Sequence, residues 1–321
     1  MRPTGKLHLG HLFGVLANWR AFQDDPNYEC HYMVADWHAF SSEYKKPEQM
    51  PMNIIDVACD WLASGIDPEQ SAIFVQSAVP EHTELNLLLS MITPLPWLER
   101  NPTYKELISE LKNKDIHTIG FLGYPVLQAA DILIYKANAV PIGADQLPHL
   151  ELTREIARRF NHFYGEFFPE PEAVLTQTPK VAGTDNRKMS KSYNNCLYLS
   201  DSPDELSKKI MVMVTDPARV RRHDKGHPEV CSVFSFHNII NKEEVPQIDA
   251  DCRSAAIGCH DCKKNMAAKL IAHMEPLYEK RLAWSKQQDQ IRDILLAGNR
   301  VARQTATINL EAAKKLAGML W

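Results

Sequence analysis

Two short motifs, far apart in the chain, carry side chains suited to phosphate chemistry. Residues 3–11 read PTGKLHLGH and residues 188–192 read KMSKS. At their spacing His8 and His11 share one face of a helix, and the start of a helix favours phosphate through its free N–H groups and its dipole. Lys188 and Lys191 are charged at neutral pH and can bind a triphosphate more strongly as pyrophosphate departs. Each motif alone also fits a solvated helix start or a basic loop. Together they predict the two halves of an ATP site that activates a carboxylate as an adenylate.

Residues around both motifs support this interpretation. Gly10 lies between the histidines and removes a side chain where a flat adenine ring could approach the backbone. The polar stretch 176–195 contains Gly183 and ends in Asn194 and Asn195. We therefore expect a mobile loop that closes over bound nucleotide.

A helix expected over Thr118–Tyr135 carries one polar stripe. Tyr124, Gln128, Asp131 and Tyr135 fall at i, i+4, i+7 and i+11 among Leu, Val, Ala and Ile residues. A buried helix with one polar face usually lines a site or a polar contact, although such a stripe can also face water. Indole offers one N–H donor on a large apolar body, so a single carboxylate in an apolar slot suits it. Asp131 is the candidate acceptor.

Four of the seven cysteines form a second candidate site. Cys231, Cys252, Cys259 and Cys262 give the spacing C-x20-C-x6-C-x2-C. A CxxC pair with two further cysteines nearby predicts a metal centre in a cytosolic protein. The odd total of seven cysteines separately argues against a full disulfide framework. Four thiolates suit tetrahedral zinc or a [4Fe–4S] cluster, and the spacing does not distinguish the two.

The basic segment 219–225 (RVRRHDK) lies just before Cys231. Such runs are usually solvated, but here the segment is a candidate contact for nucleic-acid phosphates.

The composition sets the class of protein. The 321 residues are 45% apolar and 24% charged, with a net charge of −4, which is ordinary for a globular protein of two domains. A nucleic-acid partner must therefore be held by local patches and not by a global basic field. No apolar run is long enough to cross a bilayer, and no basic-then-apolar leader is present. We expect no membrane contact and a cytoplasmic location.

The elements that must position these motifs alternate in the first half of the chain. Helical spacing over Gly10–Phe22 and Pro47–Ala63 alternates with strand-like runs at Glu29–Ala35 and Ser71–Gln76. This alternation predicts βαβ units, a parallel sheet and an α/β fold. The further elements that we expect there are helices at Glu84–Ile92, Tyr104–Lys112, Thr118–Tyr135 and Asp145–Asn161, and a strand at Ala139–Ile142.

From Pro203 onward the pattern is helical, with Ser202 as the expected cap. We expect three parts along the chain. Residues 1–195 form a catalytic domain that includes the KMSKS loop, and residues 196–300 form a mostly helical domain that holds the four cysteines. Residues 301–321 form a C-terminal helix that packs back on the catalytic domain.

The motifs resemble those of the class I aminoacyl-tRNA synthetases, and specifically the bacterial-type tryptophanyl-tRNA synthetases. The segment His8–His11 is similar to the HIGH sequence of that class, and residues 188–192 match KMSKS letter for letter. The resemblance covers nearly the whole chain, including Tyr124–Leu133, Pro141–Gln146 and His149–Arg154. It implies a Rossmann-like catalytic domain and a helical anticodon-binding domain. It also implies a homodimer that activates L-tryptophan with ATP and Mg²⁺ and transfers it to tRNA(Trp).

The resemblance assigns roles to individual residues. It implies catalytic contacts from His8, His11, Lys188 and Lys191. The further ATP-binding positions that it implies are Arg2, Pro3, Thr4, Gly10, Gly143, Ala144, Asp145, Val181, Met189, Ser190 and Ser192. It makes Asp131 the acceptor of the indole N–H and places around the substrate Tyr124, Gln128, Gln146 and His38. For the four cysteines it implies a [4Fe–4S] cluster, with Zn²⁺ as the alternative.

Three other functions compete with this interpretation. A tyrosyl-tRNA synthetase could also use Asp131, although the intact KMSKS favours tryptophan. A small-molecule nucleotidyltransferase would not need a helical domain beside a metal site, and a cluster-bearing redox protein would not need ATP.

In relatives a strand precedes the Pro-Thr-Gly turn, whereas this sequence begins at Met1-Arg2. We therefore expect a catalytic sheet that lacks one strand and a loosely held N-terminal turn.

Overall fold

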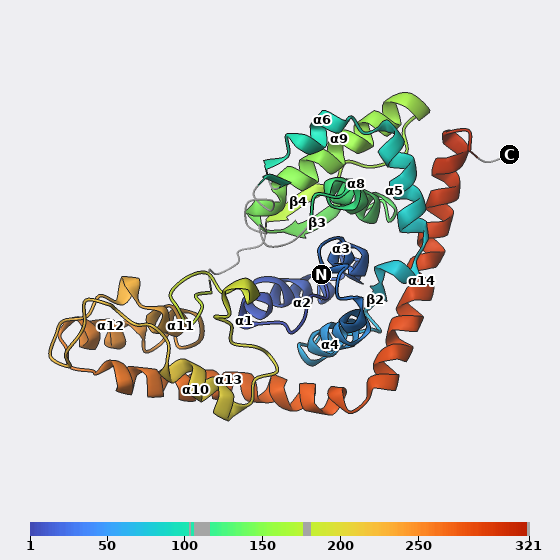
Figure 1. The fold of residues 1–321 in the computed structure, drawn as a ribbon. Helices are drawn as coiled ribbons and strands as arrows, with labels where there is room; N and C mark the ends of the chain where they lie inside the picture. The colour runs from blue at the N-terminus through green and yellow to red at the C-terminus, as the bar shows by residue number, and fades with distance from the viewer. Residues whose placement is uncertain (103, 106–115, 176–180, 320–321) are drawn as a thin grey trace.

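Two short parallel sheets organise the first half of the chain. The computed structural model describes residues 1–102, 104, 105, 116–175 and 181–319 (Figure 1). Strand β1(Cys30–Val34) pairs in parallel with β2(Ser71–Val75), and β3(Ala139–Ile142) pairs in parallel with β4(Glu172–Leu175). Parallel strands need a crossover, and helices supply it in both pairs. The predicted α/β fold with parallel pairing is confirmed.

Helices account for most of the remaining chain. Those of the first half are α1(Leu9–His11), α2(Ala17–Gln23), α3(Asp36–Glu43), α4(Met50–Ala63), α5(Glu81–Ile92), α6(Leu95–Glu99), α8(Ile119–Leu133) and α9(Leu147–Tyr164). Those of the second half are α10(Pro203–Met211), α11(Ser232–Ile240), α12(Val245–Arg253), α13(Cys259–Ser285) and α14(Gln288–Leu316). The helix expected over Tyr104–Lys112 lies largely outside the described residues. Within the described ranges, no helix is long and apolar enough to cross a membrane.

Local sequence signals explain several of these boundaries. Ser202 caps α10, because its hydroxyl accepts the N–H of Glu205 and the Glu205 carboxylate accepts the N–H of Ser202. The first helix is interrupted by a π-helical segment, η1(Leu12–Leu16), between α1 and α2. Such bulges are frequent at functional sites, and this one directly follows the histidine motif.

The N-terminal turn is held on both sides. The Met1 ammonium donates to the carbonyl of Met33 at 2.5 Å, and the Ala35 N–H donates to the carbonyl of Met1 at 2.8 Å, so Met1 lies along the edge of β1. Beyond the turn, Leu7 and Leu9 exchange backbone hydrogen bonds with the segment 197–199 at 3.0 and 2.9 Å. The expectation of a loosely held turn is therefore wrong. The turn gains its support from distant parts of the chain.

Two long helices join the halves of the molecule. In Figure 1, α13 runs from α11 and α10 toward α4, and α14 then passes β2, α4 and α5. Gly298 allows α14 to approach β2 closely, because a Cβ there would lie 1.9 Å from the Ile73 carbonyl oxygen. Asn299 accepts the N–H of Val75 at 2.8 Å, and Arg303 pairs with Glu81 at 2.9 Å. The division expected at 300/301 falls inside α14, which packs on the first half along its length.

Candidate active site

The histidine motif forms its own helix cap. The N–H of Gly10 donates to Nδ1 of His8 at 3.1 Å, and the N–H of His8 donates to Nδ1 of His11 at 3.1 Å. Because Nδ1 accepts in both neutral rings, each ring carries its proton on Nε2. The ring centroids lie 3.8 Å apart. The motif therefore presents two adjacent N–H donors at a helix start, an arrangement that suits phosphate oxygens.

The surroundings keep both histidines neutral. Burial, followed by the positive charges of Lys191 and Lys188, lowers the pKa of His8 to about 4. Burial, followed by His8 and Lys191, lowers the pKa of His11 to about 2. Gly10 is required for this geometry, because a Cβ there would lie 2.9 Å from the His8 ring. The glycine thus makes room for the histidine ring.

The KMSKS loop is folded around one asparagine. Buried Asn195 accepts the N–H of Ser190 at 2.8 Å and donates to Asp185 at 2.6 Å and to the Lys188 carbonyl at 3.2 Å. Gly183 leaves space for this side chain, because a Cβ there would lie 2.1 Å from Nδ2 of Asn195. The loop residues 181–195 are thus ordered by a polar centre.

Lys191 joins the two motifs. Its Nζ donates to the carbonyl of Gly5 at 2.8 Å, across 186 residues of sequence. Burial lowers the pKa of Lys191 to about 8, against the opposing effects of Cys196 and Asp60. Lys188 is exposed. The structure therefore brings His8, His11 and Lys191 close together.

The remaining predicted ATP residues lie on connecting segments. The Met189 N–H donates to the Val181 carbonyl at 3.0 Å, and both side chains are buried. Gly143 leads into a 3₁₀ turn at Ala144–Gln146, where a Cβ on Gly143 would lie 2.7 Å from the carboxylate of Asp145. In the N-terminal turn Pro3 is buried, and Thr4 is partly exposed; in the loop Ser190 is partly exposed, and Ser192 is exposed.

Asp131 is the centre of a buried polar network. His38 Nε2 lies 2.7 Å from Oδ2, His82 Nδ1 lies 2.6 Å from Oδ1, and Gln76 Nε2 donates to both oxygens at 2.8 Å. His82 Nε2 also lies 2.8 Å from the Tyr135 hydroxyl. Burial acts to raise the pKa of Asp131, but the hydrogen bonds from His38 and His82 outweigh it and lower the pKa to about 2. The carboxylate is therefore ionised and its lone pairs are engaged.

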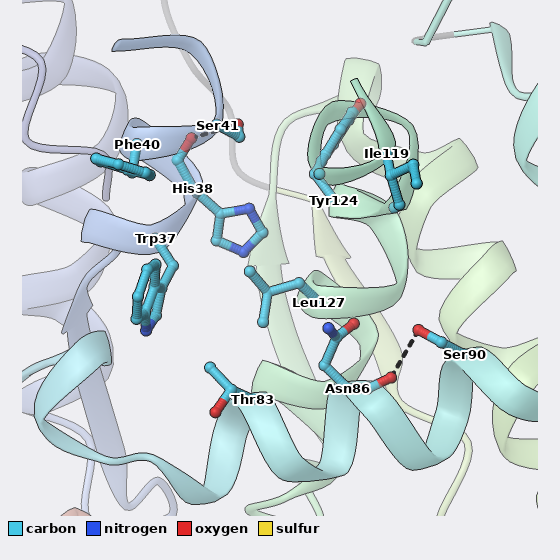
Figure 2. Close-up of a pocket in the computed structure, with 12 residues that line it drawn as sticks. Trp37, His38, Phe40, Ser41, Thr83, Asn86, Ser90, Ile119, Tyr124 and Leu127 are labelled. Carbon is cyan, nitrogen blue, oxygen red and sulfur yellow. Dashed lines mark hydrogen bonds between the residues drawn. The ribbon is translucent and has the colours of Figure 1, made fainter. Parts of the chain in front are cut away.

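Two of the five predicted tryptophan-binding residues, His38 and Tyr124, border a cavity of about 330 Å³. Figure 2 shows the His38 ring pointing from α3 toward Tyr124 and Leu127 of α8, with Thr83 and Asn86 of α5 on the other side of the cavity. Tyr124 contacts His149, whose Nε2 lies 2.7 Å from the tyrosine hydroxyl. Asp131, Gln128 and Gln146 do not line this cavity.

Gln76 and His82 were absent from the residues predicted for the site. Both follow β2, at the carboxyl end of a parallel strand, where ligands of α/β proteins usually bind. That position was the available signal. Asn195 had been assigned only to loop flexibility, and nothing in the sequence marked it as the centre of the loop.

The four cysteines are free thiols gathered around the start of α13. Burial, followed by the proximity of Cys231, Cys252 and Cys259, raises the pKa of Cys262 to about 12. Buried Arg219 points Nη1 at the Cys252 sulfur at 3.8 Å, and its Nε finds no partner among the described residues. Four thiols beside the buried guanidinium of Arg219 fit an anionic thiolate centre in their chemistry. As they stand, no three Cys, His, Asp or Glu side chains in the described ranges are disposed to hold a metal ion.

The basic segment 219–225 divides into two parts. Arg219 is buried and donates to the carbonyls of Arg222 and Ile257 at 3.0 and 2.6 Å. Arg221, Arg222 and His223 are exposed. Only the exposed part is available to a partner, so the expectation for Arg219 as a phosphate contact is wrong.

Comparison with known proteins adds an independent observation. A family described as tRNA synthetases class I (W and Y) matches residues 1–275. The chain is 50% identical to the tryptophan–tRNA ligase of Thermotoga maritima over 323 residues, which cover 100% of this chain and 98% of the relative. It is 44% identical to that of Aquifex aeolicus over 98% of this chain and 97% of the relative. The structure of a tryptophanyl-tRNA synthetase from Campylobacter jejuni, complexed with ADP and tryptophan, is similar with a TM-score of 0.89 at 31% identity, over 99% of this chain and 98% of that one.

Proposed function

The chain belongs to the class I tRNA synthetases for tryptophan and tyrosine and is a bacterial-type tryptophan–tRNA ligase, and from this premise we propose how its residues divide the work. The tyrosyl and nucleotidyltransferase alternatives do not account for full-length identities of 38–50% to tryptophan–tRNA ligases. The single observation that carries the assignment of the site is the contact between Lys191 and Gly5, which brings both ATP motifs together.

The first half-reaction forms the adenylate. A carboxylate oxygen of tryptophan bonds to the α-phosphorus of ATP, and the bond to the pyrophosphate oxygen breaks as pyrophosphate takes the electron pair. Nε2–H of His8 and His11 and the ammonium of Lys191 serve the phosphates, with Lys188 added when the loop closes. Mg²⁺ travels with the nucleotide and offsets its charge. Such contacts stabilise charge in the transition state, and the loss of one typically costs about 3 kcal/mol.

The second half-reaction transfers the amino acid. A hydroxyl oxygen of the terminal tRNA ribose bonds to the adenylate carbonyl carbon, and AMP leaves with the electron pair of the broken C–O bond. The hydroxyl proton passes to the departing AMP phosphate. No covalent enzyme intermediate is required. The protein therefore contributes positioning and electrostatic stabilisation, and the neutral histidines act as hydrogen-bond donors.

Tryptophan recognition centres on Asp131. Its oxygens already accept from His38, Gln76 and His82, so an indole N–H must take the place of one donor. His38 is the candidate to move, because it alone of the three borders the cavity. Gln128, Gln146 and Tyr124 complete the proposed surroundings of the substrate.

Pyrophosphate exchange tests this assignment. Exchange should depend on tryptophan and not on tyrosine, and His11→Asn should abolish most of it while the protein keeps its thermal midpoint. Exchange driven by tyrosine alone would contradict the specificity. Full exchange by the His11 variant would contradict the assigned ATP site.

The four cysteines are the proposed ligands of a [4Fe–4S] cluster, with Zn²⁺ as the alternative. The cluster would supply a rigid cross-link between the start of α13 and the segments before it. Arg219 would offset its negative charge from the position 3.8 Å from Cys252. Iron, sulfide and zinc analysis of anaerobically purified protein, with visible absorption, decides between the two. A protein that contains neither metal would contradict both.

The helical region is the proposed tRNA-binding part, with residues 196–300 as the anticodon-binding domain and residues 1–195 as the catalytic domain. Arg221, Arg222 and His223 are exposed beside the cysteines and can neutralise phosphates. Replacement of Cys259 by Ser should damage tRNA charging and spare pyrophosphate exchange. Equal loss of both activities in a folded protein would contradict a role confined to tRNA.

A second copy of the chain is the proposed partner of one apolar surface. Trp37 and Phe40 on α3 and Ile119 on α8 are exposed around the cavity of Figure 2, and Ile119 is 91% exposed. Met91 on the adjacent helix α5 is exposed as well. Exposed apolar groups on adjacent elements mark interaction surfaces. Ile119→Glu should convert a homodimer into a monomer in sedimentation analysis; a wild-type monomer would contradict the proposal.

The proposed location is the cytoplasm, where tRNA charging serves translation.

A further inference from the structure

We propose that Asp60 and Arg281 form a positioning pair that holds the His8–His11 turn in its working conformation and ties this turn to the helical half of the chain. The inference rests on the proposed ATP site, because it assigns a purpose to groups behind that site. Neither residue belongs to the motifs, and they lie 221 residues apart.

The geometry links three separate segments. Asp60 lies on α4 and is 1% exposed. One carboxylate oxygen accepts Nε of Arg281 from α13 at 2.6 Å, and the other accepts the N–H of Leu7 at 3.3 Å. Arg281 also reaches Asp56 at 3.6 Å. The carboxylate therefore stands directly between the long helix and the residue that precedes His8.

The hydrogen bond to Leu7 fulfils a backbone requirement. Leu7 is buried, and a buried N–H without an acceptor is costly. Its carbonyl is satisfied by Leu199 at 3.0 Å, but its N–H finds its partner in Asp60. A side chain thus supplies the acceptor that a neighbouring strand would supply in a regular sheet, and the direction of the Leu7 N–H is fixed by Asp60.

Asp60 can perform this task only while Arg281 supports it. A buried carboxylate without a counter-charge is strongly disfavoured, and the removal of one partner leaves that charge uncompensated. Burial raises the pKa of Asp60 to about 6, although Arg281 and the Leu7 N–H act in the opposite direction. Asp60 also favours the charged form of Lys191. One buried carboxylate therefore supports both halves of the ATP site.

The position of Arg281 connects this carboxylate with a distant region. Helix α13 has 27 residues, about 40 Å, and carries Cys259 and Cys262 in its first turn. Arg281 lies in its last turns, where Cys59 also contacts its carbonyl at 3.6 Å. A displacement of α13 would therefore move Arg281 relative to Asp60, and a displaced Asp60 would in turn shift its hydrogen bond to the Leu7 N–H.

A purely structural bridge between α13 and α4 is the competing explanation, and the two predict different kinetics. Displacement of a catalytic group by about 1 Å can lower a rate by roughly 100-fold. The variants Asp60→Asn, Arg281→Gln and the double variant should each lower kcat of tryptophan-dependent pyrophosphate exchange by roughly 10- to 100-fold. KM for tryptophan should stay within about twofold, because the Asp131 network is separate. The double variant should lose no more than the worse single variant, because both act through one contact.

Two further variants provide controls. Arg281→Lys keeps the charge and should recover part of the rate. Lys269→Gln removes an exposed ion pair of equal length on the same helix, which joins Lys269 to Glu244 at 2.6 Å, and should leave the rate unchanged. A fall in thermal midpoint with an unchanged kcat would overturn the proposal, as would independent, multiplying effects of the two single changes. Loss of activity in His11→Asn together with full activity in all Asp60 and Arg281 variants would refute this inference alone and leave the ATP site intact.

Discussion

The lowered pKa of Lys191 predicts a pH dependence for ATP binding. Burial lowers this pKa to about 8, so the ammonium loses its proton as the pH rises through 8 in the free enzyme. In the proposed ATP site the charged form of Lys191 binds phosphate, and its Nζ donates to the Gly5 carbonyl. Productive ATP binding should therefore weaken above pH 8.

The magnitude follows from the fraction of charged Lys191. With a pKa of about 8, roughly 90% of the side chain is charged at pH 7 and roughly 10% at pH 9. The value of kcat/KM for ATP should therefore fall roughly tenfold between these pH values, since this parameter reports the free enzyme. Bound ATP adds negative charge and favours the ammonium, so kcat itself should remain nearly constant over the same range.

The assay is tryptophan-dependent pyrophosphate exchange at saturating tryptophan from pH 6.5 to 9. The pKa values of His8 and His11, about 4 and about 2, lie outside this window, so neither histidine contributes to the change. Lys191→Arg is the matched control, because a guanidinium stays charged throughout. The dependence of kcat/KM for ATP on pH should be flat above pH 8 in Lys191→Arg. Lys188→Gln should lower the rate without a change in the shape of this pH dependence.

A basic limb of equal size in Lys191→Arg and wild type would contradict the assignment of this pH dependence to Lys191. Such a limb would belong to a different group. A wild-type profile that stays flat up to pH 9 would show that Lys191 retains its proton in the free enzyme. Burial would then lower the pKa of Lys191 by less than the structure indicates.

Three further predictions concern single side chains. Gly10→Ala places a Cβ 2.9 Å from the His8 ring, so exchange should fall at least tenfold with an unchanged thermal midpoint; an unaffected rate would contradict the role of this histidine geometry. Asp131→Asn removes the charge that three donors share, so KM for tryptophan should rise at least tenfold while KM for ATP stays constant, and equal changes in both would contradict the assignment. Gly298→Ala forces α14 away from β2 and should lower the free energy of unfolding by about 1–3 kcal/mol in urea titrations; an unchanged midpoint would show that the two elements separate without cost.

The sequence predicted the elements whose signals are local. The strand runs at Glu29–Ala35 and Ser71–Gln76 became β1 and β2, because short apolar runs between turns favour buried parallel strands. The cap at Ser202 was predicted because serine stands directly before Pro203, the first residue of α10. The two ATP motifs were found for the same reason, since each is continuous in sequence and its residue types suit phosphate.

The partners of these motifs were beyond such signals. Asp131 was identified from helical periodicity, but Gln76 and His82 reach it from 55 and 49 residues away. Periodicity describes which face of one helix is polar and contains no information on which loop will cover that face. The most that the sequence offered was the rule that functional side chains follow parallel strands at their carboxyl ends.

The N-terminal turn is held by contacts that the sequence does not reveal. A turn usually depends on the strand that precedes it, and for this reason the sequence predicted a loosely held turn. In the fold, Leu7 is bonded instead by Leu199 on one side and by Asp60 on the other, and Asp60 is in turn held by Arg281. The precise position of His8 and His11 is therefore a property of the assembled chain. We therefore expect a change at Arg281, near the end of α13, to alter catalysis at a turn whose Leu7 lies 274 residues earlier in the sequence. The residues of the turn itself stay the same.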